Sequence, residues 1–286
     1  MKLQVVCQHY YPESFPLTRM CPLLAENGDK VRVLTGLPNY PEGKIYKGYR
    51  GFKNRRQHLE GVSIVRAGLI PRGQSNFGLL LNYVSFAFLA TIRAFFLSKD
   101  FDAVLVIQSS PVSMALPGML LKRLTKKPLY IYTFDLWPES LVAGGVQPGS
   151  RVYRLIKKFS KWVYASADKI FVSSDGFRDY FRDIHGLSDH VHYLPFYEAD
   201  MTLPKAKKPT GKTHLVFAGN IGHLQSVATL VKAAKRLEDT DVFISVVGDG
   251  SEKLACEKLA EELNVKNLVF SGKKPFSEMP ALYASA

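Results

Sequence analysis

The segment Lys30-Val31-Arg32-Val33-Leu34-Thr35 runs directly into Gly36-Leu37-Pro38-Asn39-Tyr40-Pro41-Glu42-Gly43-Lys44-Ile45-Tyr46. The first six residues favour a strand, and the prolines and glycines that follow end it in a loop. The same combination of a short strand and a loop recurs along the chain, with apolar helical stretches between the strands. This alternation, with continuous apolar strands, is typical of a parallel, doubly wound α/β sheet.

Two such series follow each other. In the first, the predicted strands cover residues 3–7, 30–35, 62–67, 103–107, 129–133, 169–173 and 192–194, and the predicted helices cover 77–97, 112–124, 150–166 and 175–184. In the second, the predicted strands cover 215–218, 242–247 and 267–271, and the predicted helices cover 224–237, 252–263 and 278–286. A polar stretch at 204–212 without apolar periodicity separates them, as in a linker.

These boundaries predict a Rossmann-like N-terminal domain over residues 1–203, a linker at 204–212 and a partial C-terminal domain over 213–286. Three strands are too few for a finished doubly wound sheet, so we expect the chain to be a fragment of a longer protein.

Charge is concentrated in the first series. The 286 residues carry a formal net charge of +13. Residues 1–200 hold 26 Lys or Arg against 16 Asp or Glu, whereas residues 201–286 hold 12 against 9. Lipid headgroups, nucleic acid and phosphorylated substrates are all compatible with this excess. Three widely spaced cysteines without a metal or CxxC pattern indicate a reducing, cytosolic setting, and no signal peptide is expected.

Dinucleotide and metal sites are not expected. The loop after the first strand, residues 7–13, has no glycine, which argues against NAD or FAD. Two Asp-x-Asp triplets, at residues 100–102 and 239–241, each precede a strand, where acidic residues commonly close a turn. We therefore predict no bound metal and no cofactor.

Glycine turns mark the second series as a phosphate-binding domain. Gly219, Asn220 and Gly222 follow the strand at 215–218, and Gly248, Asp249 and Gly250 follow the strand at 242–247. Glycines allow backbone amides to approach a ligand, and a helix N-terminus favours a diphosphate. The alternative is a pair of simple tight turns.

Two carboxylates follow the strand at 129–133. Asp135 and Glu139 could orient a hydroxyl or assist proton transfer, and we assign them as the candidate catalytic residues. The alternative is a Trp-Pro turn that caps the next helix.

Three segments could contact a membrane. The stretch 77–97 is apolar nearly all round, but it contains Asn82 and Arg93, so burial in the fold or interfacial docking fits better than a membrane span. Residues 151–161 place cations on one helical face and apolar side chains on the other, and residues 44–56 combine six basic residues with aromatic ones. An ordinary surface helix is the alternative for 151–161, and no RNA-binding motif supports nucleic acid as a partner.

The chain resembles glycosyltransferase family 4. The likeness lies in Tyr-Tyr-Pro-Glu at 10–13, the segment 33–46, Ser-Pro at 110–111, Asp-Leu-Trp-Pro-Glu-Ser-Leu at 135–141 and Ala-Gly-Asn-Ile-Gly at 218–222. It covers essentially all 286 residues. The Leu-Pro-Asn-Tyr-Pro and Asp-Leu-Trp-Pro-Glu blocks point to the bacterial subgroup that builds O-antigen and capsule repeats, including N-acetyl-L-fucosaminyl transferases.

This resemblance implies the GT-B fold of two Rossmann-like domains. It implies a retaining, metal-independent transfer from a nucleotide sugar, UDP-linked in our interpretation, to a polyprenyl-diphosphate-linked saccharide. The C-terminal domain would hold the donor through the two glycine turns and Gln225, which stands near where the family usually has a basic residue. The family's Glu-x7-Glu pair is expected beyond residue 286, and we therefore expect this chain to bind its donor weakly and to be inactive.

The acceptor side would be formed by the loops after the first two strands. The residues that we assign to it are Tyr11, Glu13, Asn39, Tyr40 and Lys44. In the wider family a glycine-rich loop stands where this chain has residues 13–16. We expect a cytoplasmic protein held peripherally at the inner face of the cell membrane. The alternatives are a UDP-sugar 2-epimerase and the non-catalytic, membrane-docking half of a two-chain transferase.

Overall fold

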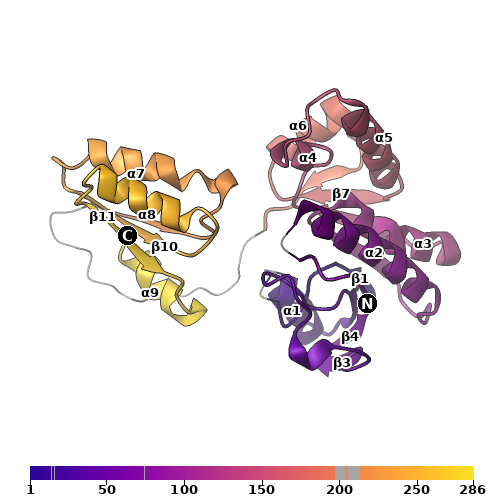
Figure 1. Ribbon diagram of the computed structural model, residues 1–286. Helices are drawn as coiled ribbons and strands as arrows, with labels where there is room; N and C mark the ends of the chain where they lie inside the picture. Colours follow the sequence, from indigo (N-terminus) through magenta and orange to yellow (C-terminus); the bar gives the residue numbers. More distant parts are fainter. Residues whose placement is uncertain (14, 16, 74, 197–203, 205–212) are drawn as a thin grey trace. The chain divides into compact units, whose positions relative to one another are not determined.

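The computed structural model describes residues 1–13, 15, 17–73, 75–196, 204 and 213–286 (Figure 1). The chain divides into two compact units, unit 1 from Met1 to Tyr197 and unit 2 from Glu198 to Ala286. Apart from Pro204, the predicted linker at 204–212 lies outside the described residues.

Unit 1 is built on an eight-stranded sheet in the order β3-β4-β2-β1-β5-β6-β7-β8. All neighbouring strands are parallel except β3 and β4. The strands are β1 (Lys2–Val6), β2 (Lys30–Thr35), β3 (Arg56–Leu59), β4 (Val62–Arg66), β5 (Ala103–Gln108), β6 (Leu129–Thr133), β7 (Lys169–Val172) and β8 (Val191–Tyr193).

Helices connect these strands and cover the sheet (Figure 1). They are α1 (Leu17–Glu26), α2 (Asn76–Phe95), α3 (Leu116–Thr125), α4 (Glu139–Ala143), α5 (Arg151–Ala165) and α6 (Gly176–Tyr180). α2 packs beside α3, and both α2 and α5 contact the 3-10 turn Val112–Ala115 that precedes α3.

The core lies along the central strands because their side chains are buried on both faces of the sheet. Val5 of β1 lies opposite Val33 of β2 and Leu105 of β5. Val5, Val33, Val106 and Ile131 have no exposed surface. This explains why the strands appear in the sequence as continuous apolar runs.

The predicted elements of unit 1 match the observed ones with small shifts, and a few short elements were missed. Sequence reasoning did not predict β3, which is half exposed and pairs antiparallel with β4 at the sheet edge. It also missed α4 and α1, whose helical pattern is interrupted by Pro22. The helix predicted at 175–184 is divided into α6 and a π-helical turn, Phe181–His185.

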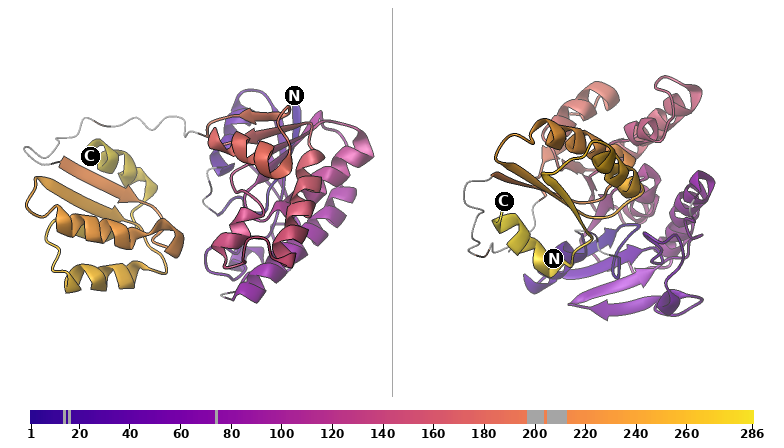
Figure 2. Two further views of the ribbon diagram at one scale, coloured as in Figure 1. Left: turned by 90° about the horizontal axis from the view of Figure 1, so that it is seen from above. Right: turned by 60° about the vertical axis from the view of Figure 1, so that its left-hand side comes forward.

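In its described part, unit 2 has three parallel strands in the order β11-β10-β9. The strands are β9 (Thr213–Ala218), β10 (Val242–Val247) and β11 (Leu268–Gly272), and the helices are α7 (Val227–Arg236), α8 (Lys253–Glu262) and α9 (Met279–Ala284). Its core centres on Ile221, Val231, Ile244 and Val246. Figure 2 shows the strands and helices of each unit from two further sides.

Candidate functional site

The carboxyl ends of β2, β1, β5 and β6 meet along one edge of the unit 1 sheet. The chain passes from β1 to β2 in one direction and from β5 to β6 in the other, so the order of the sheet reverses between β1 and β5. Doubly wound sheets bind their ligands at such a reversal, beyond the carboxyl ends of the strands. The polar loops at this edge are therefore the candidate site of unit 1.

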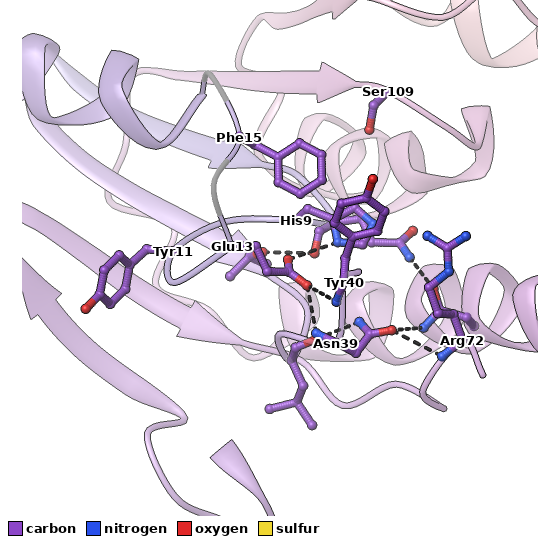
Figure 3. Close-up of polar contacts among 12 residues, drawn as sticks. His9, Tyr11, Glu13, Phe15, Asn39, Tyr40, Arg72 and Ser109 are labelled. Atoms are coloured by element: carbon purple, nitrogen blue, oxygen red, sulfur yellow. Dashed lines mark hydrogen bonds and ion pairs between the residues drawn. The ribbon is translucent and has the colours of Figure 1, made fainter. Parts of the chain in front are cut away.

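Glu13 is the centre of this site (Figure 3). Its residue is 3% exposed. One carboxylate oxygen, Oε1, accepts hydrogen bonds of 2.7 Å from the backbone amides of both Asn39 and Tyr40. The other, Oε2, lies 2.9 Å from Nδ1 of His9. A buried carboxylate with three partners fixes the loop after β1 to the loop after β2.

His9 carries the hydrogen-bonded cluster of Glu13 further along the carboxyl edge of the sheet. Because a carboxylate only accepts hydrogen bonds, Nδ1 of His9 carries a proton in this pairing, and in a neutral ring Nε2 is then an acceptor. Nε2 has no hydrogen-bond partner among the described residues. The ring stacks on Phe15 at 5.0 Å and meets the Tyr40 ring edge-on at 5.9 Å.

Asn39 occupies an interior position. The residue has no exposed surface, and its Oδ1 accepts from the backbone amide of Arg72 at 3.1 Å and from Nδ2 of Asn82 at 3.2 Å. Its own Nδ2 donates to the carbonyl of Leu37 at 3.0 Å. The predicted contact between the Asn39 side chain and an acceptor does not fit this position, and neither does direct contact by Glu13. Both side chains hold the loop in shape.

The remaining predicted acceptor residues are at the surface. Tyr40 is 36% exposed, and the Arg72 guanidinium lies 5.2 Å from the centre of its ring. Tyr11 is 39% exposed and points away from the Glu13 cluster (Figure 3). Lys44 is exposed on the loop after β2. Tyr40 is therefore the member of this group best placed beside His9.

Asp135 and Glu139 have different surroundings. Asp135 is half-buried, and its Oδ2 accepts a 2.7 Å hydrogen bond from Ser110, whose hydroxyl also accepts from the Trp137 indole at 3.2 Å. Glu139 instead accepts from the hydroxyl of Tyr153 at 2.7 Å. Burial, together with this hydrogen bond, raises the pKa of Tyr153 to about 12. Glu139 is thus engaged with α5, whereas Asp135 belongs to the loop cluster after β5 and β6.

His185 supports the loop after β6 from behind. The residue is 1% exposed, and its Nε2 lies 2.9 Å from the Trp137 carbonyl oxygen. Burial lowers the pKa of His185 from 6.5 to about 4, so the ring is neutral and donates to that carbonyl. The ring packs against Tyr164, whose hydroxyl donates to Gln108 at the end of β5.

The sequence did not identify several of these residues, among them the buried His185. His9 and Arg72 were not singled out, and Asn82 was noted only as a polar interruption of the apolar stretch 77–97. The four-residue spacing of His9 and Glu13 was the available signal. Nothing local could connect Asn82 to Asn39, because 43 residues separate them.

In unit 2 the two predicted glycine turns pack directly against each other. The Gly219 amide donates to the Val247 carbonyl, and the Ile221 amide donates to the Asp249 carbonyl, both at 2.9 Å. Gly248 has φ +149°, and a Cβ there would overlap the carbonyl oxygen of Gly219. Gly250 has φ +159°, and a Cβ there would overlap the carbonyl oxygen of Ile221. Both glycines are therefore required by the approach of one loop to the other.

The first of these loops differs in detail from the prediction. α7 begins at Val227 rather than at residue 224, after a 3-10 turn, His223–Gln225, and Ser226 in the left-handed region at φ 49°. Asn220 and Gln225 are exposed, and their side chains hydrogen-bond to each other at 3.2 Å. The exposed edge of these loops consists of backbone and uncharged amides, with Asp249 as the acidic member.

The Asp-x-Asp triplets lie in structural turns. Asp100 pairs with the Lys2 ammonium at 2.6 Å, and Asp102 accepts the Lys2 backbone amide at 2.6 Å. Within the described residues, no group of three or more His, Cys, Asp or Glu side chains is arranged to hold a metal ion.

Comparison with known proteins gives two family matches. Residues 16–196 match the family described as glycosyl transferase 4-like domain, and residues 198–286 match the family described as glycosyl transferases group 1. A curated relative is WcaI of Escherichia coli K12, provisionally assigned as a colanic acid biosynthesis glycosyl transferase. It is 25% identical over 307 residues, which cover 99% of this chain and 74% of WcaI.

Two solved structures have a similar fold. HepE of Anabaena, in complex with UDP and glucose, aligns with a TM-score of 0.64 at 13% identity, covering 100% of this chain and 72% of HepE. WaaG, a glycosyltransferase involved in lipopolysaccharide biosynthesis, aligns with a TM-score of 0.62 at 15% identity, covering 100% of this chain and 73% of WaaG. Because both identities are below 25%, these two structures show only that the fold is similar.

Proposed function

We propose a function from the premise that this chain belongs to the glycosyl transferase 4-like family and has the two-domain GT-B fold of glycosyltransferases. The chain transfers a sugar from a nucleotide diphosphate donor, UDP-linked, to a saccharide carried on a polyprenyl diphosphate, in the synthesis of a bacterial surface polysaccharide. One observation carries the proposal. In each unit, the loops suited to bind a ligand (the polar loops of unit 1 and the glycine loops of unit 2) lie together at the carboxyl edge of its own parallel sheet.

Unit 2 supplies the donor site in this proposal. The amides of Gly219, Ile221 and Gly248 already donate to backbone carbonyls, which holds the two glycine loops in place. The other amides of these loops, such as those of Asn220 and Gly222, are therefore the ones that would meet a diphosphate. As the glycosidic bond breaks, negative charge grows on the leaving diphosphate, and preorganised backbone dipoles stabilise it. Because both glycine loops are formed in unit 2, we propose slow transfer in place of the inactivity expected from the sequence. Gln225 contributes no positive charge, and we therefore expect weak donor binding.

Unit 1 supplies the acceptor site. Nε2 of His9 and the carboxylate of Asp135 are available to accept a hydrogen bond from an acceptor hydroxyl. Tyr40 lies beside His9, and the Arg72 guanidinium, which lies over the Tyr40 ring, would bind an anionic part of the acceptor. Glu13 and Asn39 act by holding these groups in place. We propose transfer with retention of anomeric configuration, as in the family that the sequence resembles, and N-acetyl-L-fucosamine as the first donor sugar to test.

A transfer assay tests this function. The chain is incubated with a panel of radiolabelled UDP-sugars and a polyprenyl-diphosphate-linked saccharide, and the lipid phase is analysed for label and anomeric configuration. We expect label from one donor in the lipid phase and at least a tenfold loss with Asp135→Asn. Lys258→Gln, on α8 of unit 2, is the matched surface control. Epimerised, untransferred UDP-sugar would instead identify an epimerase, and UDP-sugar left intact with every acceptor would overturn the proposal.

A further inference from the structure

The outer side of α2 is an apolar stripe. Six large apolar side chains, each between 43% and 68% exposed, recur at helical spacing along it: Phe77, Leu80, Val84, Phe88, Ile92 and Phe95. The helix has 20 residues, so the stripe is about 30 Å long. An apolar surface of this size rarely faces water in a soluble protein and marks a site of interaction.

A groove continues this stripe between α2, α3 and α5. Its volume is about 960 Å³, and its walls include Val84 and Phe88 of α2, Leu116 and Leu120 of α3, and Trp162 of α5. Trp162 is 56% exposed. The lining contains no Asp or Glu, and its charged members are the cations Lys122, Arg123 and Lys126. The groove therefore suits an apolar chain next to a negative headgroup.

Charge identifies the kind of partner. α2, α3 and α5 carry eight Lys or Arg side chains, one in α2, two in α3 and five in α5, and no Asp or Glu. Over the whole chain there are 38 Lys or Arg and 25 Asp or Glu residues, so this face is more strongly cationic than the chain as a whole. Two copies of this face would repel each other, and a nucleic acid would leave the apolar stripe in water. An anionic bilayer satisfies both features.

The structure also argues for a helix that lies on the bilayer. Among the described residues, α2 is the one helix long and apolar enough to cross a membrane. Its opposite side is tied to the sheet, however, because the Asn82 side chain donates to the carbonyl of Ile70 at 2.6 Å and accepts from Gln8 at 2.7 Å. Ala90 and Ala94 on that side are buried. Only the outer stripe is free to enter lipid.

We propose that the α2–α3–α5 face docks on an anionic phospholipid bilayer, with the α2 stripe in the headgroup region and a lipid hydrocarbon chain in the groove beside Trp162. This deepens the proposed function by naming the surface and the lipid that bring the enzyme to its acceptor. The contact places the amino end of α2, which reaches Asn39 through Asn82, at the membrane. The Glu13 cluster would then lie close to lipid-linked substrates.

Tryptophan fluorescence tests the groove directly. The chain has two tryptophans, and Trp137 is only 7% exposed, so brominated lipids quench Trp162 selectively if it enters the bilayer. The probes are vesicles of phosphatidylcholine alone and of phosphatidylcholine with about one third phosphatidylglycerol. We expect quenching with the anionic vesicles and its loss in Trp162→Phe. Vesicle binding without quenching would overturn the groove assignment.

Substitutions separate the apolar from the charged contribution. Sedimentation with the anionic vesicles should show at least about tenfold weaker binding for Phe88→Ala, because burial of an aromatic side chain is lost. Arg123→Gln with Lys126→Gln should weaken binding about 30-fold, at about 1 kcal/mol per cation. The matched controls are in unit 2: Leu254→Ala, which is 73% exposed on α8, and Lys232→Gln with Arg236→Gln on α7. Unchanged urea midpoints show that the variants are folded.

Two outcomes would overturn the inference: vesicle binding that the α2–α3 variants leave unchanged, or a dimer in sedimentation that Phe88→Ala dissociates. The binding assay contains no nucleotide sugar, so the two proposals fail separately. Vesicle binding without sugar transfer would overturn the proposed function alone. Transfer to a detergent-dispersed acceptor without vesicle binding would overturn the docking proposal alone.

Discussion

The carboxyl edges of the two sheets are constructed differently. In unit 1 the edge is held by side chains: Glu13, Asn39 and Asn82 join loops from distant parts of the chain through buried hydrogen bonds. In unit 2 the edge is held by backbone, because Gly248 and Gly250 let two loops approach to hydrogen-bonding distance. Side chains can preorganise a site for varied hydroxyl groups, whereas close-packed backbone suits the diphosphate that all nucleotide diphosphate sugars share.

The largest effect that we predict tests the side-chain edge. Glu13→Ala leaves the buried amide of Asn39 and the half-buried amide of Tyr40 without acceptors, and we expect it to lower the free energy of unfolding of unit 1 by about 4 kcal/mol. Both tryptophans lie in unit 1, so urea unfolding followed by tryptophan fluorescence measures that unit. Glu13→Gln keeps an oxygen for the amides and should lose less than half as much. Equal losses in the two variants would show that the amides do not depend on this oxygen.

The next prediction concerns the pH dependence of stability that His185, beneath the loop after β6, gives to unit 1. Burial lowers the pKa of His185 to about 4 in the folded protein, against 6.5 when unfolded. Above pH 6.5 the ring is neutral in both states and the stabilisation is complete. As the pH falls toward 4, the unfolded state binds the proton first, and about 3 kcal/mol is lost.

Tryptophan-monitored unfolding between pH 7 and 4 measures this loss. His185→Gln keeps a donor for the Trp137 carbonyl but cannot titrate, and its unfolding should depend less on pH by that amount. A pH slope equal to that of the unsubstituted protein would assign the effect to other groups.

A smaller effect tests the backbone edge. Gly248→Ala forces a Cβ toward the Gly219 carbonyl oxygen at a φ of +149°, and we expect unit 2 to lose about 2 kcal/mol. Circular dichroism should show the loss in a transition that tryptophan fluorescence does not follow. If the fluorescence transition shifted by the same amount, the two units would be unfolding together.

The smallest effect separates ligand approach from packing in the same loop. Gly219→Ala meets nothing closer than 3.8 Å and needs no positive φ, so unit 2 should change by less than about 0.5 kcal/mol. UDP titration calorimetry should nonetheless show weaker binding if the diphosphate lies against this backbone. Unchanged UDP affinity would move the donor site away from Gly219.

The position of the candidate site in the fold was partly visible in the sequence. Asp135, Tyr40 and the glycine turns were predicted because each follows a strand and lies at the edge where ligands bind. The roles of Glu13 and Asn39 were not, because the partners through which they join separate loops are 26 or more residues away. Sequence spacing identifies such residues as polar loop members, but burial decides whether a polar side chain binds a ligand or holds the loop.

The sequence by itself determined the order of strands and helices, the two series and the fold class. It did so because a strand buried on both faces must be a continuous apolar run, and this requirement is local. The tertiary structure decided which side of the apolar stretch 77–97 faces the sheet, since a helix that is apolar nearly all round gives no direction in its sequence. The tertiary structure also brings Gly248 into contact with Gly219, and His9 into contact with Tyr40. Those contacts depend on how strands far apart in the chain lie side by side, which only the packed sheet fixes.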